Sequence, residues 1–109
     1  MTYVVVTIKR VLDLEAFRDY AARVAPIIES YGGKYVAVDK KPDVRSGEWP
    51  FIRTVIVAYP NYEAAQKWYD SAEYQRIIPI RMRAIDANIA MVRDAEEAGI
   101  DMDPRKSGA

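Results

Sequence analysis

Two segments of this chain carry apolar residues at both odd and even positions of an expected β-strand. One reads YVVVTIK over Tyr3–Lys9, and the other reads EWPFIRTVIVAY over Glu48–Tyr59. When a sheet is covered on one side only, its strands alternate between apolar and polar residues, because the other face meets water. Strands that are apolar at both parities therefore predict a sheet whose two faces are both covered.

The remaining elements supply cover for only one of these faces. In chain order we expect a strand at 3–9, a helix at 14–31, strands at 34–40 and 48–59, a short helix at 62–69, a helix at 72–85 and a strand at 88–93. Asp13, Asn61 and Ser71 precede the three helices as N-caps. This β-α-β-β-α-β order is typical of a ferredoxin-like α+β domain, with a four-stranded antiparallel sheet and helices on one face.

A second copy of the chain is the simplest cover for the remaining face. Residues 1–94 account for a single ferredoxin-like domain, and no further strand or helix is expected after it. Packing of the sheet against the same sheet of another subunit would bury both apolar faces, so we expect a homodimer. Residues 95–109 form a polar tail with little periodicity, which we expect to be mobile or packed on the partner subunit.

Charge and composition argue against several classes of function. Sixteen Lys and Arg residues balance sixteen Asp and Glu residues, so no net charge attracts nucleic acid or an anionic membrane. No segment approaches the length of a membrane span and no signal peptide is recognised, so we expect a cytoplasmic protein. The chain has no Cys and no His, which removes the thiolate nucleophile, the commonest general base and the commonest metal ligand. We therefore expect no metal site and no cofactor.

Arg53 is the strongest candidate for a functional residue. It lies within an apolar strand, and a buried guanidinium must meet an anion or strong hydrogen-bond acceptors. An internal ion pair with Glu48, Asp70 or Glu73 would satisfy it, and we favour this interpretation because most buried arginines pair within their own protein. The alternative is a fork that binds a ligand carboxylate, carbonyl or phosphate at two points.

Aromatic residues flank the same strand, namely Trp49, Trp68, Tyr69 and Tyr74. They suit either the core and dimer interface or a mostly apolar cleft with a few polar anchors. Arg81 follows Tyr74 on the same expected helix, and it points either into that cleft or into solvent. Glu48 and Glu73 are the nearby carboxylates, and either would act as a base only if burial raised its pKa.

Three motifs together resemble one known family. They read SYGGKYVAV at 30–38, GEWPFIRTVIVAYPN at 47–61 and WYDSAEYQRIIPIR at 68–81, and the closing strand follows them. This set resembles the domain of unknown function 1330 family, within the dimeric α/β barrel superfamily, from Tyr3 to Arg93. The resemblance implies two ferredoxin-like subunits whose sheets face each other, and it implies no particular reaction.

These observations support two hypotheses of different classes. The first is a dimer that binds a small organic acid in a cleft between sheet and helices, where any catalysis would need no cofactor and Arg53 would stabilise an enolate or carboxylate. The candidate ligand-binding residues are Arg53, Trp49, Tyr69, Tyr74, Arg81 and Glu48. The second is a structural or protein-interaction module, in which the aromatics are packed solid and Arg53 is paired internally.

Overall fold

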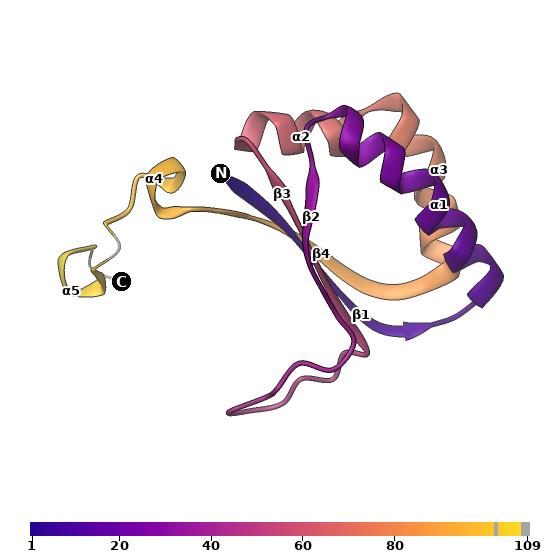
Figure 1. The fold of residues 1–109 in the computed structure, drawn as a ribbon, viewed down its shortest axis with the longest axis horizontal. Coiled ribbons are helices and arrows are strands. Elements are labelled where there is room, and N and C mark those ends of the chain that lie inside the picture. The colour runs from indigo at the N-terminus through magenta and orange to yellow at the C-terminus, as the bar shows by residue number, and fades with distance from the viewer. Residues whose placement is uncertain (102, 108–109) are drawn as a thin grey trace.

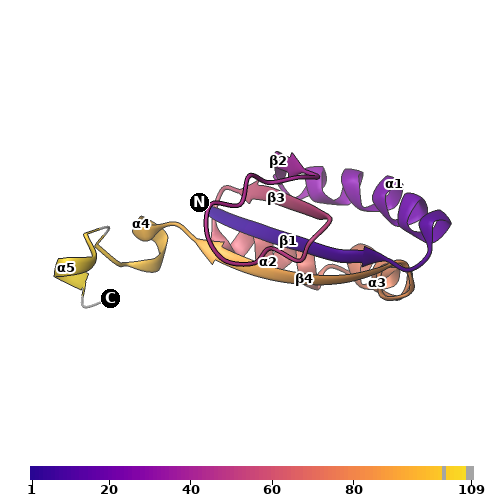
Figure 2. The ribbon, with the colours of Figure 1, turned by 90° about the horizontal axis from the view of Figure 1, so that it is seen from below.

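The computed structural model describes residues 1–101 and 103–107, and it confirms the ferredoxin-like arrangement (Figure 1). One antiparallel sheet has the strand order β2-β3-β1-β4, and its strands span Thr2–Val11 (β1), Lys34–Asp39 (β2), Arg53–Tyr59 (β3) and Ile85–Arg93 (β4). Three helices lie together on one face of this sheet, as Figures 1 and 2 show, and they span Leu14–Ser30 (α1), Tyr62–Asp70 (α2) and Ala72–Ala84 (α3).

Each of the three helices begins at its predicted N-cap. The side chains of Asp13, Asn61 and Ser71 accept hydrogen bonds from the backbone N–H three residues later, at 3.0, 2.8 and 3.1 Å respectively. Each bond satisfies a backbone donor that the first helical turn leaves without an intrahelical partner. Pro26 and Pro79 lie inside α1 and α3 without ending either helix.

Two strands begin three or more residues away from the predicted position. β3 begins at Arg53 rather than at Glu48, because residues 40–52 form a loop. Gly47 in this loop has φ +79° and Pro50 lacks a backbone N–H, and both features are typical of turns rather than of a paired strand. β4 begins at Ile85 rather than at Asn88, because pairing with Val11 beyond a bulge in β1 extends it.

The strand register sorts the side chains into rows on the two faces of the sheet. The rows that face the helices are Tyr35, Val57, Val4 and Met91, then Val38, Val55, Val6 and Ile89, then Arg53, Ile8 and Ala87. Val4, Ile8 and Val57 are buried there. Arg53 therefore begins β3 on the face that the helices cover.

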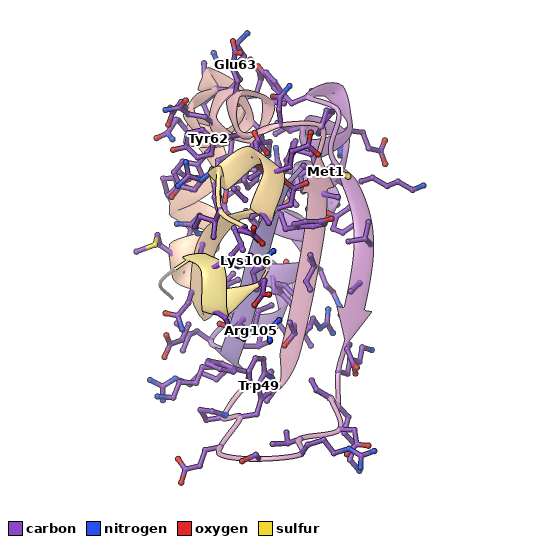
Figure 3. The ribbon with its side chains drawn as sticks, turned by 90° about the vertical axis from the view of Figure 1, so that its left-hand side faces the viewer. Met1, Trp49, Tyr62, Glu63, Arg105 and Lys106 are labelled. Atoms are coloured by element: carbon purple, nitrogen blue, oxygen red, sulfur yellow. The ribbon has the colours of Figure 1, made fainter. Side chains whose placement is uncertain are left out.

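The opposite face, which we call the open face, has none of the helices α1, α2 and α3 over it. Its middle row runs across all four strands and is entirely apolar, with Ala37, Ile56, Val5 and Ala90. The rows on either side are mixed, with Lys34, Ala58, Tyr3 and Val92 on one and Asp39, Thr54, Thr7 and Asn88 on the other. Figure 3 looks from this side, where the described C-terminal segment lies in front of the sheet. Among the described residues, the helices α1, α2 and α3 thus cover only one of the two apolar faces.

The hydrophobic core lies between the sheet and the helices. Its main buried cluster is Val4, Val24, Ile28, Val57, Tyr59, Ala65, Trp68, Tyr74 and Ile77. The sequence of the expected helix at 72–85 predicts an inner face that includes Tyr74, Ile77, Ile78 and Met82. On α3, Tyr74 and Ile77 are buried as predicted, but the prediction for Met82 is wrong, since Met82 is 64% exposed. The inward stripe continues through Arg81 and Ala84 instead, because steps of three and four residues follow one side of a helix.

The double glycine after α1 has two separate structural reasons. Gly32 has φ +84°, a left-handed conformation that ends the helix at low cost only for glycine. Gly33 makes room for an aromatic ring, because a Cβ at this position would lie 2.6 Å from Ile28 Cγ2 and 2.8 Å from the ring of Tyr59. The absence of a side chain at Gly33 therefore lets Tyr59 pack against the end of α1.

Two short helices follow β4, at Ala95–Ala98 (α4) and Pro104–Ser107 (α5), and this segment projects away from the sheet (Figure 1). Within the predicted tail at 95–109, residues 102, 108 and 109 lie outside the described residues. Among the described helices, none has both the length and the apolar character needed to cross a membrane.

The start of this tail is held by the first residues of the chain. The amino group of Met1 lies 2.6 Å from Asp94 Oδ2 and 3.4 Å from Glu97 Oε1. The Thr2 hydroxyl donates to Glu97 at 2.6 Å, and the backbone N–H of Tyr62 donates to the same carboxylate. α4 is therefore tied to β1 and to the start of α2.

Candidate ligand-binding site

A cavity of about 170 Å³ lies between the sheet and the helices α1 and α3. Most of its wall is apolar and comes from the strands and from α1, including Val4, Val6, Ile8, Val55, Val57 and Ile89. A cavity of about 150 Å³ engineered into another protein binds benzene. This cavity therefore has room for a ligand with one six-membered ring.

Five lining residues carry a polar group, and they are Tyr20, Tyr35, Arg53, Trp68 and Arg81. No carboxylate lines the cavity in the part of the chain that the structure describes. Arginine and tryptophan side chains only donate hydrogen bonds, while a tyrosine hydroxyl both donates and accepts. An apolar cavity with two guanidinium groups and no acid favours a ligand that is an anion or a strong acceptor.

Arg53 reaches the cavity from the first position of β3 and is half-buried. Its Cζ atom lies 5.1 Å from the ring centroid of Phe17, on α1. Such a cation–π contact contributes about 0.5–1 kcal/mol and does not itself provide a hydrogen-bond acceptor for the N–H groups of the guanidinium. Among the described residues, Arg53 takes part in no ion pair.

The internal ion pair favoured for Arg53 from the sequence is therefore wrong. Glu48 is exposed on the loop at 40–52, and Asp70 is exposed at the end of α2. Glu73 instead accepts a hydrogen bond from the Tyr31 hydroxyl at 2.9 Å. Glu48 lies in the loop because β3 begins at Arg53 rather than at Glu48.

Arg81 reaches the same cavity from the last turn of α3, where it contacts two tyrosines. Its Nη1 donates to the Tyr74 hydroxyl at 2.7 Å, and the Tyr74 and Tyr20 hydroxyls lie 2.9 Å apart. The Arg81 Cζ atom also lies 5.9 Å from the ring centroids of Tyr69 and Tyr74. Of the two hydrogen-bonded tyrosines, only Tyr20 lines the cavity, while Tyr74 is fully buried behind it.

Burial and charge set the protonation of this group. Burial raises the pKa of Tyr20 far above its ordinary value, and it also raises the pKa of Tyr74, although Tyr20 and Arg81 partly oppose that rise. Burial lowers the pKa of Arg81, but the adjacent Tyr74 and Tyr69 outweigh it and leave the pKa raised. Across the physiological pH range, Tyr20 and Tyr74 are therefore neutral phenols and Arg81 is a charged guanidinium.

Two buried polar groups near the cavity have no partner among the described residues. They are the Tyr59 hydroxyl and the Nε1–H of Trp68. Trp68 lines the cavity and is 2% exposed, and its ring stacks on Tyr59 with 5.7 Å between centroids. An unpaired buried donor costs free energy, so the Trp68 N–H adds to the donor character of this region.

The structure brings Arg53 and Arg81 together around one cavity and places the other candidates elsewhere. Tyr69 and Tyr74 lie behind Arg81 and do not form part of the lining. Trp49 Nε1 donates to Thr54 Oγ1 at 3.3 Å, and Thr54 belongs to the open face. Trp49, labelled in Figure 3, and the exposed Glu48 therefore lie outside the cavity.

Tyr20 is the lining residue that sequence reasoning missed. The apolar residues of the expected helix at 14–31 predict an inner face of Leu14, Phe17, Ala21, Val24, Ile28 and Tyr31, which does not include Tyr20. Its position, three residues after Phe17 and four before Val24, places it on the same side of the helix and was the available signal. Its contact with Tyr74, which is 54 residues away in the chain, carries no signal in the local sequence.

The described residues do not form a recognisable metal-binding site. No group of three or more Asp, Glu, His or Cys side chains is placed there to hold a metal ion. The lining of the cavity also offers no carboxylate ligand. The chemistry of this site is therefore that of hydrogen-bond donors in an apolar wall.

The fold and the site define a ferredoxin-like α+β domain with a donor-lined cavity between its sheet and its helices. The chain belongs to the family described as domain of unknown function DUF1330, whose model matches residues 1–95. The resemblance found in the sequence is thus confirmed. No protein with a curated description matches the chain.

Solved structures show the same fold at low sequence identity. A protein of unknown function from Rhodopseudomonas palustris has a TM-score of 0.70 and 18% identity, covering 84% of this chain and 80% of its own. A putative antibiotic biosynthesis monooxygenase from Nitrosomonas europaea has a TM-score of 0.59 and 14% identity, covering 84% and 96%. SnoaB from Streptomyces nogalater, a cofactor-independent oxygenase, has a TM-score of 0.55 and 13% identity, covering 84% and 88%. At these identities the likeness shows the fold alone.

Proposed function

We propose that this protein is a homodimer that binds a small organic acid in the cavity of each subunit, with Arg53 as the anchor for the carboxylate. The observation that carries the proposal is a guanidinium that lines an apolar cavity and has no anionic partner among the described residues. Withdrawing a charge from water without pairing it costs free energy. A ligand carboxylate would remove that cost, because it can accept two parallel hydrogen bonds from one guanidinium.

The size and walls of the cavity limit the class of acid. A volume of about 170 Å³ suits one ring or a short branched chain, and the valine and isoleucine wall favours an apolar body. Small aromatic acids and keto acids meet both conditions. A second charge far from the carboxylate of the ligand would lie against apolar wall and weaken binding.

A thermal-unfolding screen of small aromatic and keto acids tests the proposal. At a concentration of 100 times its dissociation constant, a bound acid raises the free energy of unfolding by about 2.7 kcal/mol. We expect this stabilisation to be lost in Arg53→Gln and retained in Arg76→Gln, which removes an exposed arginine of α3. A stabilisation that persists unchanged in Arg53→Gln would remove Arg53 as the anchor.

The alternative is a structural or protein-interaction module without small-molecule chemistry. It expects solid packing around the aromatics and an internal partner for Arg53. Two observations argue against it: the cavity beside Arg53, and the absence of an ion pair at Arg53 among the described residues. The same screen discriminates, since a module of this kind would show no stabilisation by any acid.

The homodimer is proposed from the open face. The row of Ala37, Ile56, Val5 and Ala90 is apolar across the full width of the sheet, and the helices α1, α2 and α3 lie on the other face. A second copy would supply an identical apolar row, which suits the self-complementary interface of a two-fold dimer. We propose that the described tail residues, which project on this side of the sheet in Figure 1, pack on the partner subunit. The cytoplasmic location expected from the sequence stays a prediction.

The site supports binding more directly than catalysis. Its neutral tyrosines and charged arginines can stabilise negative charge on a ligand oxygen, as an enolate or a carboxylate requires. The described lining offers no carboxylate to remove a proton, and burial keeps Tyr20 protonated by raising its pKa. A reaction here would therefore need the ligand itself to supply the base.

A further inference from the structure

The direction of the hydrogen bonds that join Arg81, Tyr74 and Tyr20 follows from burial. Arg81 has only donors, so its Nη1–H points at the Tyr74 oxygen. The Tyr74 hydroxyl has one hydrogen to place, and among the described residues the Tyr20 oxygen is the only acceptor recorded within reach. Because Tyr74 is fully buried, any other placement would leave a buried donor unpaired. The hydrogen bonds therefore run from Arg81 to Tyr74 and from Tyr74 to Tyr20.

This direction leaves the hydroxyl hydrogen of Tyr20 available to a ligand. The Tyr20 oxygen is already the acceptor in its bond with Tyr74, so its own hydrogen is free to turn toward the cavity that Tyr20 lines. The chain begins at a charged guanidinium, and successive hydrogen bonds polarise one another. The Tyr20 hydroxyl thus adds a polarised donor to those of Arg53 and Arg81 in the lining of the cavity.

Tyr20 and Arg53 both line the cavity, which has room for one six-membered ring. Arg53 lies over the ring of Phe17, and Tyr20 follows Phe17 by three residues on the same side of α1. A ring-sized acid in the cavity therefore meets walls that carry both donors.

We propose that the ligand is a ring-sized carboxylic acid with a second oxygen acceptor on its ring, held by Arg53 at the carboxylate and by Tyr20 at the second oxygen. Hydroxybenzoates and cyclic keto acids belong to this class. The inference rests on the proposed function, since it needs Arg53 to hold the carboxylate. Tyr74 is a positioning residue, because it lies outside the lining and fixes the direction of the Tyr20 hydroxyl. Because both contacts are donors, they favour a ligand whose second oxygen carries negative charge.

Calorimetry with 4-hydroxybenzoate and 4-methylbenzoate tests the second contact, because the two compounds have similar shapes and differ in the acceptor. We expect the wild-type protein to prefer the hydroxy compound by about tenfold, the effect of one good hydrogen bond. Tyr20→Phe is expected to abolish this preference and to leave the affinity for 4-methylbenzoate within about twofold. Arg53→Gln is expected to weaken both compounds equally.

Ultraviolet titration of bound 4-hydroxybenzoate tests the positioning role separately. We expect its phenol to ionise at a lower pH when bound than when free, because donors and a nearby guanidinium stabilise the phenolate. Tyr74→Phe is expected to reduce this shift while Tyr20 is still present. Tyr31→Phe is the matched control, since the Tyr31 hydroxyl bonds Glu73 outside the cavity.

The outcomes separate the inference from the proposed function. If the two benzoates bind with equal affinity and both depend on Arg53, the second contact is overturned and the proposed function stands. A preference for 4-hydroxybenzoate that survives in Tyr20→Phe also overturns the inference. If neither compound binds the wild-type protein, both the inference and the proposed role of Arg53 as the anchor for a carboxylate are overturned.

Discussion

The two faces of the sheet are built from similar apolar residues, yet they differ in what they leave unfilled. On the face that the helices cover, Val55 and Val57 line a cavity that also contains Arg53. On the open face, Ile56 and Val5 lie in a continuous apolar row with no charge among them. One face thus contains a cavity between the sheet and the helices, and the other is a continuous apolar surface. The difference teaches that an apolar strand pattern indicates that a face is covered, but not what covers it.

The largest expected effect comes from placing a charge on the open face. Ile56→Asp would put two carboxylates, one from each subunit, into the proposed interface, where each uncompensated charge costs about 3–5 kcal/mol. We expect the dimer dissociation constant to rise by at least about 100-fold, measured by sedimentation equilibrium. Gln66→Asp, on the exposed side of α2, is the control and should leave the dimer unchanged. A wild-type protein that stays monomeric at all concentrations would end the proposed role of this face.

A smaller effect is expected from overfilling the covered face. Gly33→Ala would place a methyl group against Ile28 and the Tyr59 ring, at separations that require the core to shift. We expect the free energy of unfolding to fall by about 2–3 kcal/mol, measured by urea denaturation.

Gly47→Ala is the matched control for this substitution. It lies on the loop at φ +79° with no atom within 4 Å of the added carbon, so it should cost only the backbone strain of about 1 kcal/mol. Equal losses for the two variants would show that packing of Tyr59 is not the reason for the glycine.

Removing the unpaired hydroxyl of Tyr59 is expected to stabilise the same face. Tyr59→Phe eliminates a buried group without a partner among the described residues, so the free energy of unfolding should rise by about 1 kcal/mol near neutral pH. Chemical denaturation at a series of pH values measures this gain. A loss of stability in the variant would mean that the hydroxyl has a partner, such as an ordered water.

Tyr59→Phe should also change how the free energy of unfolding depends on pH under alkaline conditions. Burial raises the pKa of Tyr59 above the value of about 10 in the unfolded chain. Above about pH 10 the unfolded chain loses this proton while the folded chain keeps it, so the free energy of unfolding falls as the pH rises. In Tyr59→Phe this contribution disappears, and stability should fall less steeply above pH 10.

The smallest effect is expected from Arg53 in the protein without ligand. Arg53→Met keeps an apolar contact with Phe17 and removes a charge that has no ion-pair partner among the described residues. We expect the free energy of unfolding to rise by about 0.5 kcal/mol while acid binding is lost, a trade of stability against function. Arg45→Met, at an arginine exposed on the loop, should change neither quantity. A clear loss of stability in Arg53→Met would reveal an internal partner and restore the ion-pair hypothesis.

Much of the fold could be predicted because its signals are local. Asp13, Asn61 and Ser71 mark helix starts by side-chain chemistry alone, and the strand and helix periods fix the order of elements. Boundaries that depend on pairing were less accurate, as the start of β4 at Ile85 shows. That start is set by Val11, a residue far away in the chain.

The residues of the candidate site also differ in whether the local sequence could predict them. Arg53 could be nominated because a charge within an apolar strand stands out in the sequence, and Arg81 because it follows Tyr74 on the same expected helix. Trp49 could not be assigned to a face, since its position depends on how the loop turns back to Thr54. Tyr20 could not be paired with Tyr74 until α1 and α3 were packed together.

The sequence by itself determined the order of the elements, the helix caps and the need for cover on both faces of the sheet, because these follow from local sterics and from burial of apolar side chains. Only the tertiary structure decided that Arg53 meets a cavity rather than an acid, and that Arg81 is linked through Tyr74 to Tyr20. These outcomes depend on the distances between atoms of segments that are remote in the chain. The packing of helices on the sheet sets those distances, and no local pattern encodes them.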